Sequence, residues 1–353
     1  MRIIRPRRLM RIVMATEGPR IAAEAIGNQP LGGAETAFAL LAQALARRGH
    51  AVEVRAGDAP AEARHGIAWA ALAKRGGAAA ELVLANRLPR LFRALPRGRR
   101  VLWLHNPGSY LRKPRHLLPL LAARPRLVTL GPGHSASLPR WLPGLLPWRP
   151  VEIPLAVAPP FDAGAAPRPP PPPVAVFTSS PLRGLDWLLD LWEARIHPAL
   201  PAAELHLYSG AATYGGDARL AARAAPALAR AAALRPAGVR LHDPLPRPIL
   251  AARLAEARLM LYRGDPGETF CLALAEAQAF GLPCVVTPLG AVPERVVDGE
   301  TGVVARSDAD FAAAAIRLLS DDAAWTAMHR AALARGPGPG WDEVAARFEA
   351  LAA

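Results

Sequence analysis

The sequence is poor in cysteine and contains no long apolar run. Only Cys271 and Cys284 occur among 353 residues, and they form neither a CxxC pair nor the spacing of a metal site. A CxxC redox motif is therefore excluded, and a reducing compartment is the simplest interpretation. No stretch of about 18 apolar residues is uninterrupted, so a membrane-spanning helix is not expected. The start, MRIIRPRRLM, is basic, but no apolar signal-peptide core follows it.

Several catalytic patterns are also missing. No DxD motif directly follows a predicted strand, and the nine histidines are scattered along the chain. The GxGxxG fingerprint of a dinucleotide-dependent dehydrogenase is absent. A Ser or Cys nucleophile with His and an acid at a recognisable spacing is absent too. We therefore expect no metal site and no cofactor.

Acidic residues are scarce in the first part of the chain. The net charge of +14 divides into +18 for residues 1–150 and −4 for residues 151–353. Such asymmetry bears on partners rather than on fold, and it fits nucleic acid, an anionic membrane or an acidic substrate. The alternative is a GC-rich genome that favours Arg, since Lys74 and Lys113 are the only lysines. That alternative explains the Arg to Lys ratio but not the slightly acidic second part.

Apolar runs alternate with Ala/Leu-rich stretches along most of the chain. Strands are predicted at residues 11–16, 51–55, 82–85, 101–104, 127–130, 151–155, 174–178, 204–208, 239–242, 259–262, 284–287 and 302–304. Helices are predicted at residues 33–48, 184–194, 220–234, 250–257 and 341–351. Alternation of strand and helix indicates parallel sheets with helices on both faces, which is an α/β fold.

The proline run PRPPPPP at residues 167–173 interrupts this alternation, and it predicts a stiff linker. We therefore expect two doubly wound, Rossmann-like domains that face a cleft. Residues 1–165 form the first domain, 166–174 the linker and 175–335 the second domain. The last helix, within residues 336–353, is expected to pack back toward the first domain.

The stretch ETFCLALAE carries one carboxylate at each end, Glu268 and Glu276. It follows the predicted strand LMLY, so Glu268 lies at the carboxyl edge of a parallel sheet, where open α/β folds bind ligands. A nucleotide sugar has a hexose and a ribose on opposite sides of a diphosphate. One carboxylate for each ring, with the diphosphate at the helix N-terminus, would fit that shape. The alternative is an ordinary helix start with a second Glu on its exposed face.

The sequence around this pair resembles the family 4 glycosyltransferases, which are retaining enzymes with the GT-B fold. Residues 260–304 carry the E-x7-E pair, a helix ending in GLP, a strand, a loop with Gly290 and Glu294, and the turn DGETG. The stretch LGGAETAFALLAQALARRGHAVEV is similar to the family's N-terminal loop and first helix. The resemblance implies that Gly32 and Gly33 approach the donor diphosphate, because glycine lets the backbone come close to a phosphate.

The resemblance implies roles for further residues. Arg183, in FTSSPLRGLDW, matches the basic residue that binds the diphosphate. A second Arg, common in the family, is replaced here by the uncharged stretch Thr178–Ser180, of which Ser179 and Ser180 are expected to contact the donor. The remaining donor-binding candidates are Asp243, Leu245, Phe270, Cys271, Leu272 and Glu276. Cys271 stands where the family commonly has Gly.

Two histidines complete the candidate site. His105, in VLWLHNPGS, matches a His that lies near the sugar and the acceptor in related enzymes, and with Glu268 it is the catalytic candidate. His134, in LGPGHSAS, is an acceptor-side candidate. A single His is more often structural, and that alternative stays open for both.

The resemblance implies a retaining hexosyltransferase that moves a sugar from a nucleotide diphosphate sugar to a glycan or lipid-linked acceptor, in cell-envelope polysaccharide synthesis. Two alternatives remain: a nucleotide-sugar-binding protein with weak catalysis, suggested by the missing second Arg, and an Arg-rich nucleic-acid-binding protein. The latter lacks interleaved aromatic residues and any familiar module, so nucleic acid is not the expected partner.

A cytoplasmic location is expected, with peripheral attachment to an anionic membrane as a further hypothesis. The segment SYLRKPRHLLPLLAARPR places Arg112, Lys113 and Arg115 among leucines. Basic groups and leucines together suit a membrane surface. Pro114 and Pro119 argue against one continuous amphipathic helix. The alternative is that the leucines pack in the core.

Overall fold

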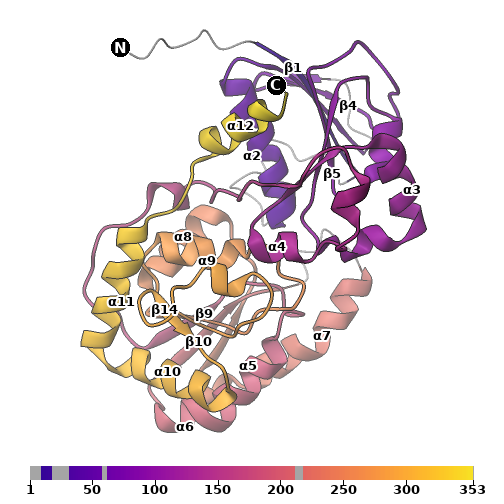
Figure 1. The fold of residues 1–353 in the computed structure, drawn as a ribbon. Coiled ribbons are helices and arrows are strands. Elements are labelled where there is room, and N and C mark those ends of the chain that lie inside the picture. Colours follow the sequence, from indigo (N-terminus) through magenta and orange to yellow (C-terminus); the bar gives the residue numbers. More distant parts are fainter. Residues whose placement is uncertain (1–8, 18–31, 58–61, 211–217, 353) are drawn as a thin grey trace. The chain divides into compact units, whose positions relative to one another are not determined.

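The computed structural model describes residues 9–17, 32–57, 62–210 and 218–352. The chain forms two compact units (Figure 1). The first contains strand β1 (Arg11–Thr16), residues 34–155 and the C-terminal segment from Trp341. The second contains residues 156–340, and Gly32 and Gly33 are grouped with it.

The first unit is built on one sheet. Its further strands are β2 (Ala51–Ala56), β3 (Glu62–Arg64), β4 (Ile67–Ala70), β5 (Leu82–Asn86), β6 (Arg99–Trp103), β7 (Arg126–Thr129) and β8 (Val151–Glu152). Its helices are α2 (Gly33–Arg47), η1 (Pro89–Arg93), η2 (Gly108–Arg112), α3 (Pro114–Ala123), α4 (Pro132–Ala136), η3 (Leu142–Leu145), α12 (Trp341–Glu349) and η9 (Ala350–Ala352).

The strand order of this sheet is β3-β4-β2-β1-β5-β6-β7-β8. β3 pairs antiparallel with β4, and the other described pairings are parallel. The chain proceeds from β1 outward to one side and then returns to β5 on the other side of β1. This reversal is the topological switch point of a doubly wound sheet. Strands such as LVLAN are buried along their whole length, as parallel strands covered on both faces must be.

The second unit has a six-stranded parallel sheet. Its strands are β9 (Val174–Phe177), β10 (Glu204–Tyr208), β11 (Val239–His242), β12 (Leu259–Tyr262), β13 (Cys284–Val286) and β14 (Gly302–Val304). Its helices are η4 (Phe161–Ala163), α5 (Leu185–Leu191), the π-helical turn η5 (Trp192–Ile196), α6 (His197–Ala199), α7 (Ala218–Ala233), η7 (Arg235–Ala237), α8 (Arg247–Glu256), α9 (Leu272–Ala279), η8 (Val292–Glu294), α10 (Asp308–Ser320) and α11 (Asp322–Arg335).

The strand order here is β11-β10-β9-β12-β13-β14, and each described pairing is parallel. The chain moves from β9 outward through β10 to β11, then returns to β12 on the other side of β9. The switch point of this sheet therefore lies between β9 and β12. Two doubly wound α/β domains, as the sequence predicts, are thus confirmed.

The proline-rich segment is held by the second unit. Arg168 donates hydrogen bonds through its guanidinium to the carbonyl oxygens of Phe280 (3.2 Å), Leu254 (3.3 Å) and Ala257 (3.1 Å). Its guanidinium also lies over the ring of Trp325. The predicted linker, residues 166–174, therefore lies inside the second unit, and the division between the units comes earlier, between Leu155 and Ala156.

The last helix, α12, packs within the first unit beside α2 (Figure 1). Arg48 and His50, which both follow the end of α2, contact the carboxylate of Glu349. The Phe348 ring meets Trp103 of β6 edge to face, with centroids 5.1 Å apart. Among the described residues, no helix is long and apolar enough to cross a membrane.

Several elements differ from the sequence prediction. The strands β3 and β4 and the helices α10 and α11 were not predicted. The segment 114–123 is one helix, α3, in spite of its prolines: Pro114 occupies the first turn, where an N–H is not needed, and Pro119 lies inside the helix. Its leucines divide between environments: Leu120 is fully buried, whereas Leu118 is 66% exposed.

Candidate active site

An ion pair joins the two strands at the switch point of the second sheet. Arg183 lies in the turn between β9 and α5, and Glu268 lies in the loop between β12 and α9. The Arg183 guanidinium contacts the Glu268 carboxylate. Glu268 is buried, whereas the Arg183 side chain is 39% exposed. The pair is therefore accessible to solvent from the Arg183 end. Open α/β sheets bind ligands at such a place, outside the carboxyl ends of the strands.

Tyr262, the last residue of β12, is part of the same cluster. Its hydroxyl donates to Glu268, and Ser179 lies 3.5 Å from the Tyr262 oxygen. Burial raises the pKa of Tyr262, and the neighbouring Cys271 and Glu268 raise it further, so the phenol stays protonated and remains a donor. Sequence reasoning missed Tyr262, although a polar-tipped aromatic residue at the carboxyl end of the strand LMLY was a usable signal.

The loop after β13 packs against the backbone of Glu268. Gly290 has φ +55°, and a Cβ there would lie 2.8 Å from the Glu268 carbonyl oxygen and 2.9 Å from its Cβ. A side chain at Gly290 would therefore displace Glu268. The N–H of Ala291 donates to the Glu268 carbonyl oxygen at 3.0 Å, and the Glu268 N–H donates to Asp265 at 2.9 Å. These contacts fix the backbone that carries the carboxylate.

Cys271 adopts a left-handed conformation, with φ 65° and ψ 76°, directly before α9. This region favours glycine, which gives a physical reason for the Gly common at this place in the family. Burial raises the pKa of the Cys271 thiol well above its usual value, so the side chain is a neutral thiol rather than a nucleophile. The backbone then turns into the helix that carries Glu276.

Glu276 forms a second ion pair, with Arg247 at the start of α8. Both side chains are nearly inaccessible, at 8% and 11% exposure. Arg247 comes just after the loop that holds Asp243 and Leu245, beyond the carboxyl end of β11. The pair therefore connects the loop of the nucleobase candidates to the helix of the ribose candidate. Arg247 was also missed, and no local pattern marks it.

The remaining donor-side candidates have separate environments. Phe270 is buried, and the Arg295 guanidinium lies 4.2 Å from its ring centroid. Leu272 begins α9. The Ser180 hydroxyl accepts from the N–H of Leu182, which shapes the turn before Arg183. Asp243 is exposed and Leu245 is half-buried. Gly33 begins α2, and Gly32 precedes it.

The two histidine candidates lie at the carboxyl edge of the first sheet. His105 follows β6, and its ring lies 4.5 Å from that of Trp103, measured between centroids. Burial lowers the pKa of His105 well below its usual value, with Arg87 and His134 adding to the shift. The ring is therefore neutral at pH 7, as a general base or hydrogen-bonding group would need.

His134 has a different environment. The N–H of Leu130 donates to Nδ1 at 3.1 Å, so Nε2 carries the proton and donates to the Asn106 carbonyl oxygen at 2.9 Å. Burial lowers the pKa of His134. Both nitrogens are occupied by backbone groups, so this ring connects the loops after β6 and β7. In the part of the chain described here, no cluster of His, Cys, Asp or Glu is suited to hold a metal ion.

Comparison with known proteins places the second unit in a family. Residues 172–321 match the family model described as glycosyl transferases group 1. These residues form a group 1 glycosyltransferase domain. The resemblance predicted from the E-x7-E region is thereby confirmed at the level of the family.

Curated relatives match over limited segments. The D-inositol 3-phosphate glycosyltransferase 1 of Catenulispora acidiphila is 35% identical over 115 residues, which are 32% of this chain and 27% of the relative. The N-acetyl-alpha-D-glucosaminyl L-malate synthase of Bacillus anthracis is 39% identical over 75 residues, which are 21% of this chain and 19% of the relative. The chain thus matches only 27% and 19% of the length of these two relatives.

Solved structures match over nearly the whole chain. A sucrose-phosphate synthase from Thermosynechococcus elongatus has a TM-score of 0.72 at 15% identity, covering 98% of each chain. The Anabaena protein HepE in complex with UDP-glucose has a TM-score of 0.66 at 14% identity, covering 96% of this chain and 98% of that one. These matches, with the two doubly wound sheets, confirm the predicted GT-B fold of this chain.

Proposed function

We propose that the protein is a retaining hexosyltransferase that uses a nucleotide diphosphate sugar. The observation that carries this proposal is the Arg183–Glu268 pair across the switch point of the second sheet. One group suits an anionic diphosphate, and the other suits the hydroxyls of a neutral sugar. A structural ion pair alone would not require a half-exposed guanidinium at the ligand-binding edge.

In this proposal each residue has one task. Arg183 holds the diphosphate, aided by Ser179, Ser180 and the N–H groups at Gly32 and Gly33. Glu268, oriented by Tyr262, accepts hydrogen bonds from hexose hydroxyls. Glu276 accepts those of the ribose, while Asp243, Leu245 and the segment Phe270–Leu272 contact the rest of the donor.

The bond between the sugar C1 and the phosphate oxygen breaks, and its electron pair stays on the diphosphate. The acceptor oxygen forms a bond to C1 on the same face, and its proton passes to the departing phosphate oxygen. The protein then contributes positioning and stabilisation of leaving-group charge rather than a nucleophile. His105, neutral and buried, is proposed to contact the sugar and the acceptor, with His134 supporting the acceptor side.

Uridine diphosphate sugars are the first donors to test, because HepE was solved with UDP-glucose and has the same fold. The acceptor is proposed to be a glycan or a lipid-linked molecule in envelope polysaccharide synthesis. The +18 balance of residues 1–150 supports an anionic acceptor or membrane surface. We also propose a cytoplasmic location with peripheral attachment to the inner membrane face.

The test is release of nucleoside diphosphate from a panel of nucleotide sugars, with and without glycan and lipid acceptors. Acceptor-dependent release should occur with one donor, and the proton NMR coupling at C1 of the product should match that of the donor. An inverted product would contradict the retaining mechanism.

A second candidate function is nucleotide-sugar binding with weak catalysis. The uncharged Thr178–Ser180 stretch favours it, since the diphosphate there meets hydroxyls instead of a second guanidinium. Donor-dependent thermal stabilisation without release or transfer would select this candidate.

A further inference from the structure

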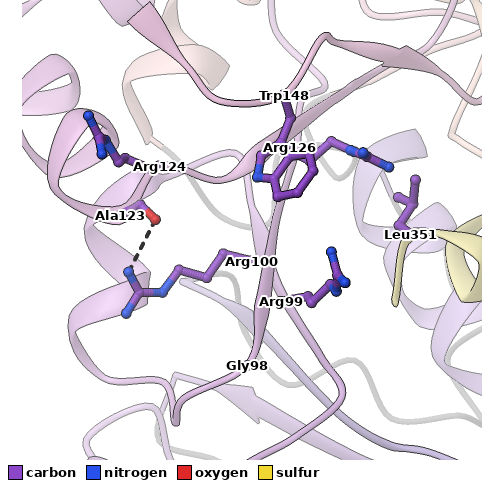
Figure 2. A pocket seen from close by; sticks show the side chains of 8 residues that line it. All are labelled: Gly98, Arg99, Arg100, Ala123, Arg124, Arg126, Trp148 and Leu351. Carbon is purple, nitrogen blue, oxygen red and sulfur yellow. Dashed lines mark hydrogen bonds between the residues drawn. The ribbon is translucent and has the colours of Figure 1, made fainter. Parts of the chain in front are cut away.

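Four arginines gather at the amino edge of the first unit's sheet. Arg99 and Arg100 open β6 and Arg126 opens β7, whereas His105 follows the opposite, carboxyl end of β6. A pocket of about 270 Å³ lies here, lined by Gly98, Arg99, Arg100, Ala123, Arg124, Arg126, Trp148 and Leu351 (Figure 2). It is therefore separate from the candidate active site.

The pleat of β6 determines how the arginines are arranged. Successive side chains of a strand point to opposite faces. Arg100 points toward α3 and donates to the Ala123 carbonyl oxygen at 3.1 Å, whereas Arg99 lies on the side of Leu351 (Figure 2). Arg126 pairs in register with Val101 and so shares the face of Arg99. The guanidinium carbons of Arg126 and Arg99 lie 4.8 Å and 5.8 Å from the Trp148 ring centroid.

Among the described residues, no acidic side chain neutralises this cluster. The residues that line the pocket include no Asp or Glu, and within the same described ranges no ion pair involves any of the four arginines. Residues 82–151 contain 13 Lys or Arg and no Asp or Glu. Like charges held together repel, and a bound anion removes that cost. The guanidinium fork matches phosphate oxygens, so a phosphate group is the ligand that suits the pocket.

Large apolar side chains are exposed in the segment that carries the pocket residue Trp148. Trp141, Leu145 and Trp148 are 46%, 50% and 39% exposed, although they belong to one segment whose Leu142 and Leu146 pack in the core. Tryptophan and leucine next to arginine are typical of the interface between membrane and water, where indole rings lie at the level of the headgroups. A soluble phosphate compound would give these side chains no role.

We propose that this pocket binds the phosphate of anionic phospholipids, while Trp141, Leu145 and Trp148 enter the interface of the bilayer. The proposal deepens the membrane attachment put forward above and rests on it, and it places the contact at the amino edge of the sheet. It is independent of sugar transfer, which the donor assay reports separately.

Sedimentation with vesicles tests it on the full chain. Vesicles of phosphatidylglycerol and phosphatidylcholine should bind the wild-type protein at low salt, and phosphatidylcholine alone should not. The variant Arg99→Ser/Arg124→Ser/Arg126→Ser should bind about 100-fold more weakly, because each arginine near an anionic surface strengthens binding roughly fivefold. A control of equal charge from the second unit, Arg306→Ser/Arg317→Ser/Arg330→Ser, should bind like the wild type.

Two further variants keep the proposal testable if the triple variant folds poorly. Trp141→Ser/Leu145→Ser should also reduce binding, and Arg112→Ser/Lys113→Ser/Arg115→Ser should reduce it much less than the pocket variant. Wild-type protein that stays in the supernatant overturns the proposal. Loss of vesicle binding in the Arg112→Ser/Lys113→Ser/Arg115→Ser variant alone also overturns it. Thermal stabilisation by inorganic phosphate and glycerol phosphate without vesicle binding overturns it too, and would identify a soluble ligand.

Discussion

Arg247 and Glu276 form an ion pair between the start of α8 and the middle of α9, and both side chains are about nine-tenths buried. Removing two charges from water is costly, and only their mutual attraction and further hydrogen bonds offset that cost. Such a pair orients the Glu276 carboxylate before the ribose that we propose as its ligand binds. Each buried charge is therefore stable only while its partner is present.

The variant Arg247→Leu should lower the free energy of unfolding by about 3–5 kcal/mol, because it leaves the Glu276 charge buried without its partner. The double variant Arg247→Leu/Glu276→Leu should recover most of this loss, since apolar replacement of both partners is often neutral. Calorimetric unfolding of the three proteins measures both effects. A double variant as unstable as the single one would show that the pair is not coupled.

Replacement of Glu276 and replacement of Glu268 should change different constants of the reaction. Glu276→Gln should weaken donor binding by about 10- to 100-fold, the usual cost of a lost charge-assisted hydrogen bond. Glu268→Gln should lower kcat more than it raises KM, because its contacts are proposed to strengthen at the reacting sugar. Glutamine is preferred to alanine because it keeps the volume and one acceptor beside Arg247 and Arg183. The exposed Glu300→Gln is the matched control and should match the wild type in both constants.

Cys271 offers a test of the backbone before α9. Cys271→Gly should change the free energy of unfolding by no more than about 1 kcal/mol, since relief of the left-handed conformation offsets the lost side chain. Cys271→Val should cost more than about 2 kcal/mol, because β-branched residues tolerate this conformation poorly. The same change at the buried strand position, Cys284→Val, should cost less. Equal losses at the two positions would argue against backbone strain at Cys271.

The buried histidines predict how stability depends on pH. Burial lowers the pKa of His105 and of His134, so below about pH 6.5 the unfolded chain binds protons that the folded chain does not. The contribution of the two neutral rings to the free energy of unfolding is therefore complete above about pH 6.5. It declines as the pH falls, by up to about 1.4 kcal/mol per pH unit for each ring. Calorimetry at pH 7.5 and 5.5 should show the decline. His105→Phe should reduce it, whereas the exposed control His65→Asn should not.

Much of the fold was predictable because its signals are local. The strands 11–16, 204–208, 239–242, 259–262 and 302–304 have the bounds that the apolar runs predict. The hairpin of β3 and β4 was missed, since its strands are short and its turn uses His65 at φ 51° before Gly66. The helices α10 and α11 were missed although Ser307 and Asp321 cap them through their side chains.

The candidate site was predictable only in part. Arg183, Glu268 and Glu276 stand in motifs whose spacing is visible in the sequence. Their partners Tyr262 and Arg247 are defined by contacts between separate elements, and in the case of Arg247 the partner is 29 residues away. The orientation of His134 likewise depends on a carbonyl group 28 residues away, at Asn106.

The central claim is that the Arg183–Glu268 cluster holds a nucleotide diphosphate sugar, and thermal shift with a panel of such sugars tests it most directly. At 100 times its dissociation constant, the correct donor should add about 2.7 kcal/mol of stability to the wild-type protein. The same donor should add much less to Arg183→Met, while Arg195→Met, a change at an exposed arginine of the second unit, should respond like the wild type. No stabilisation of the wild type by any nucleotide sugar, or undiminished stabilisation of Arg183→Met, would contradict the account.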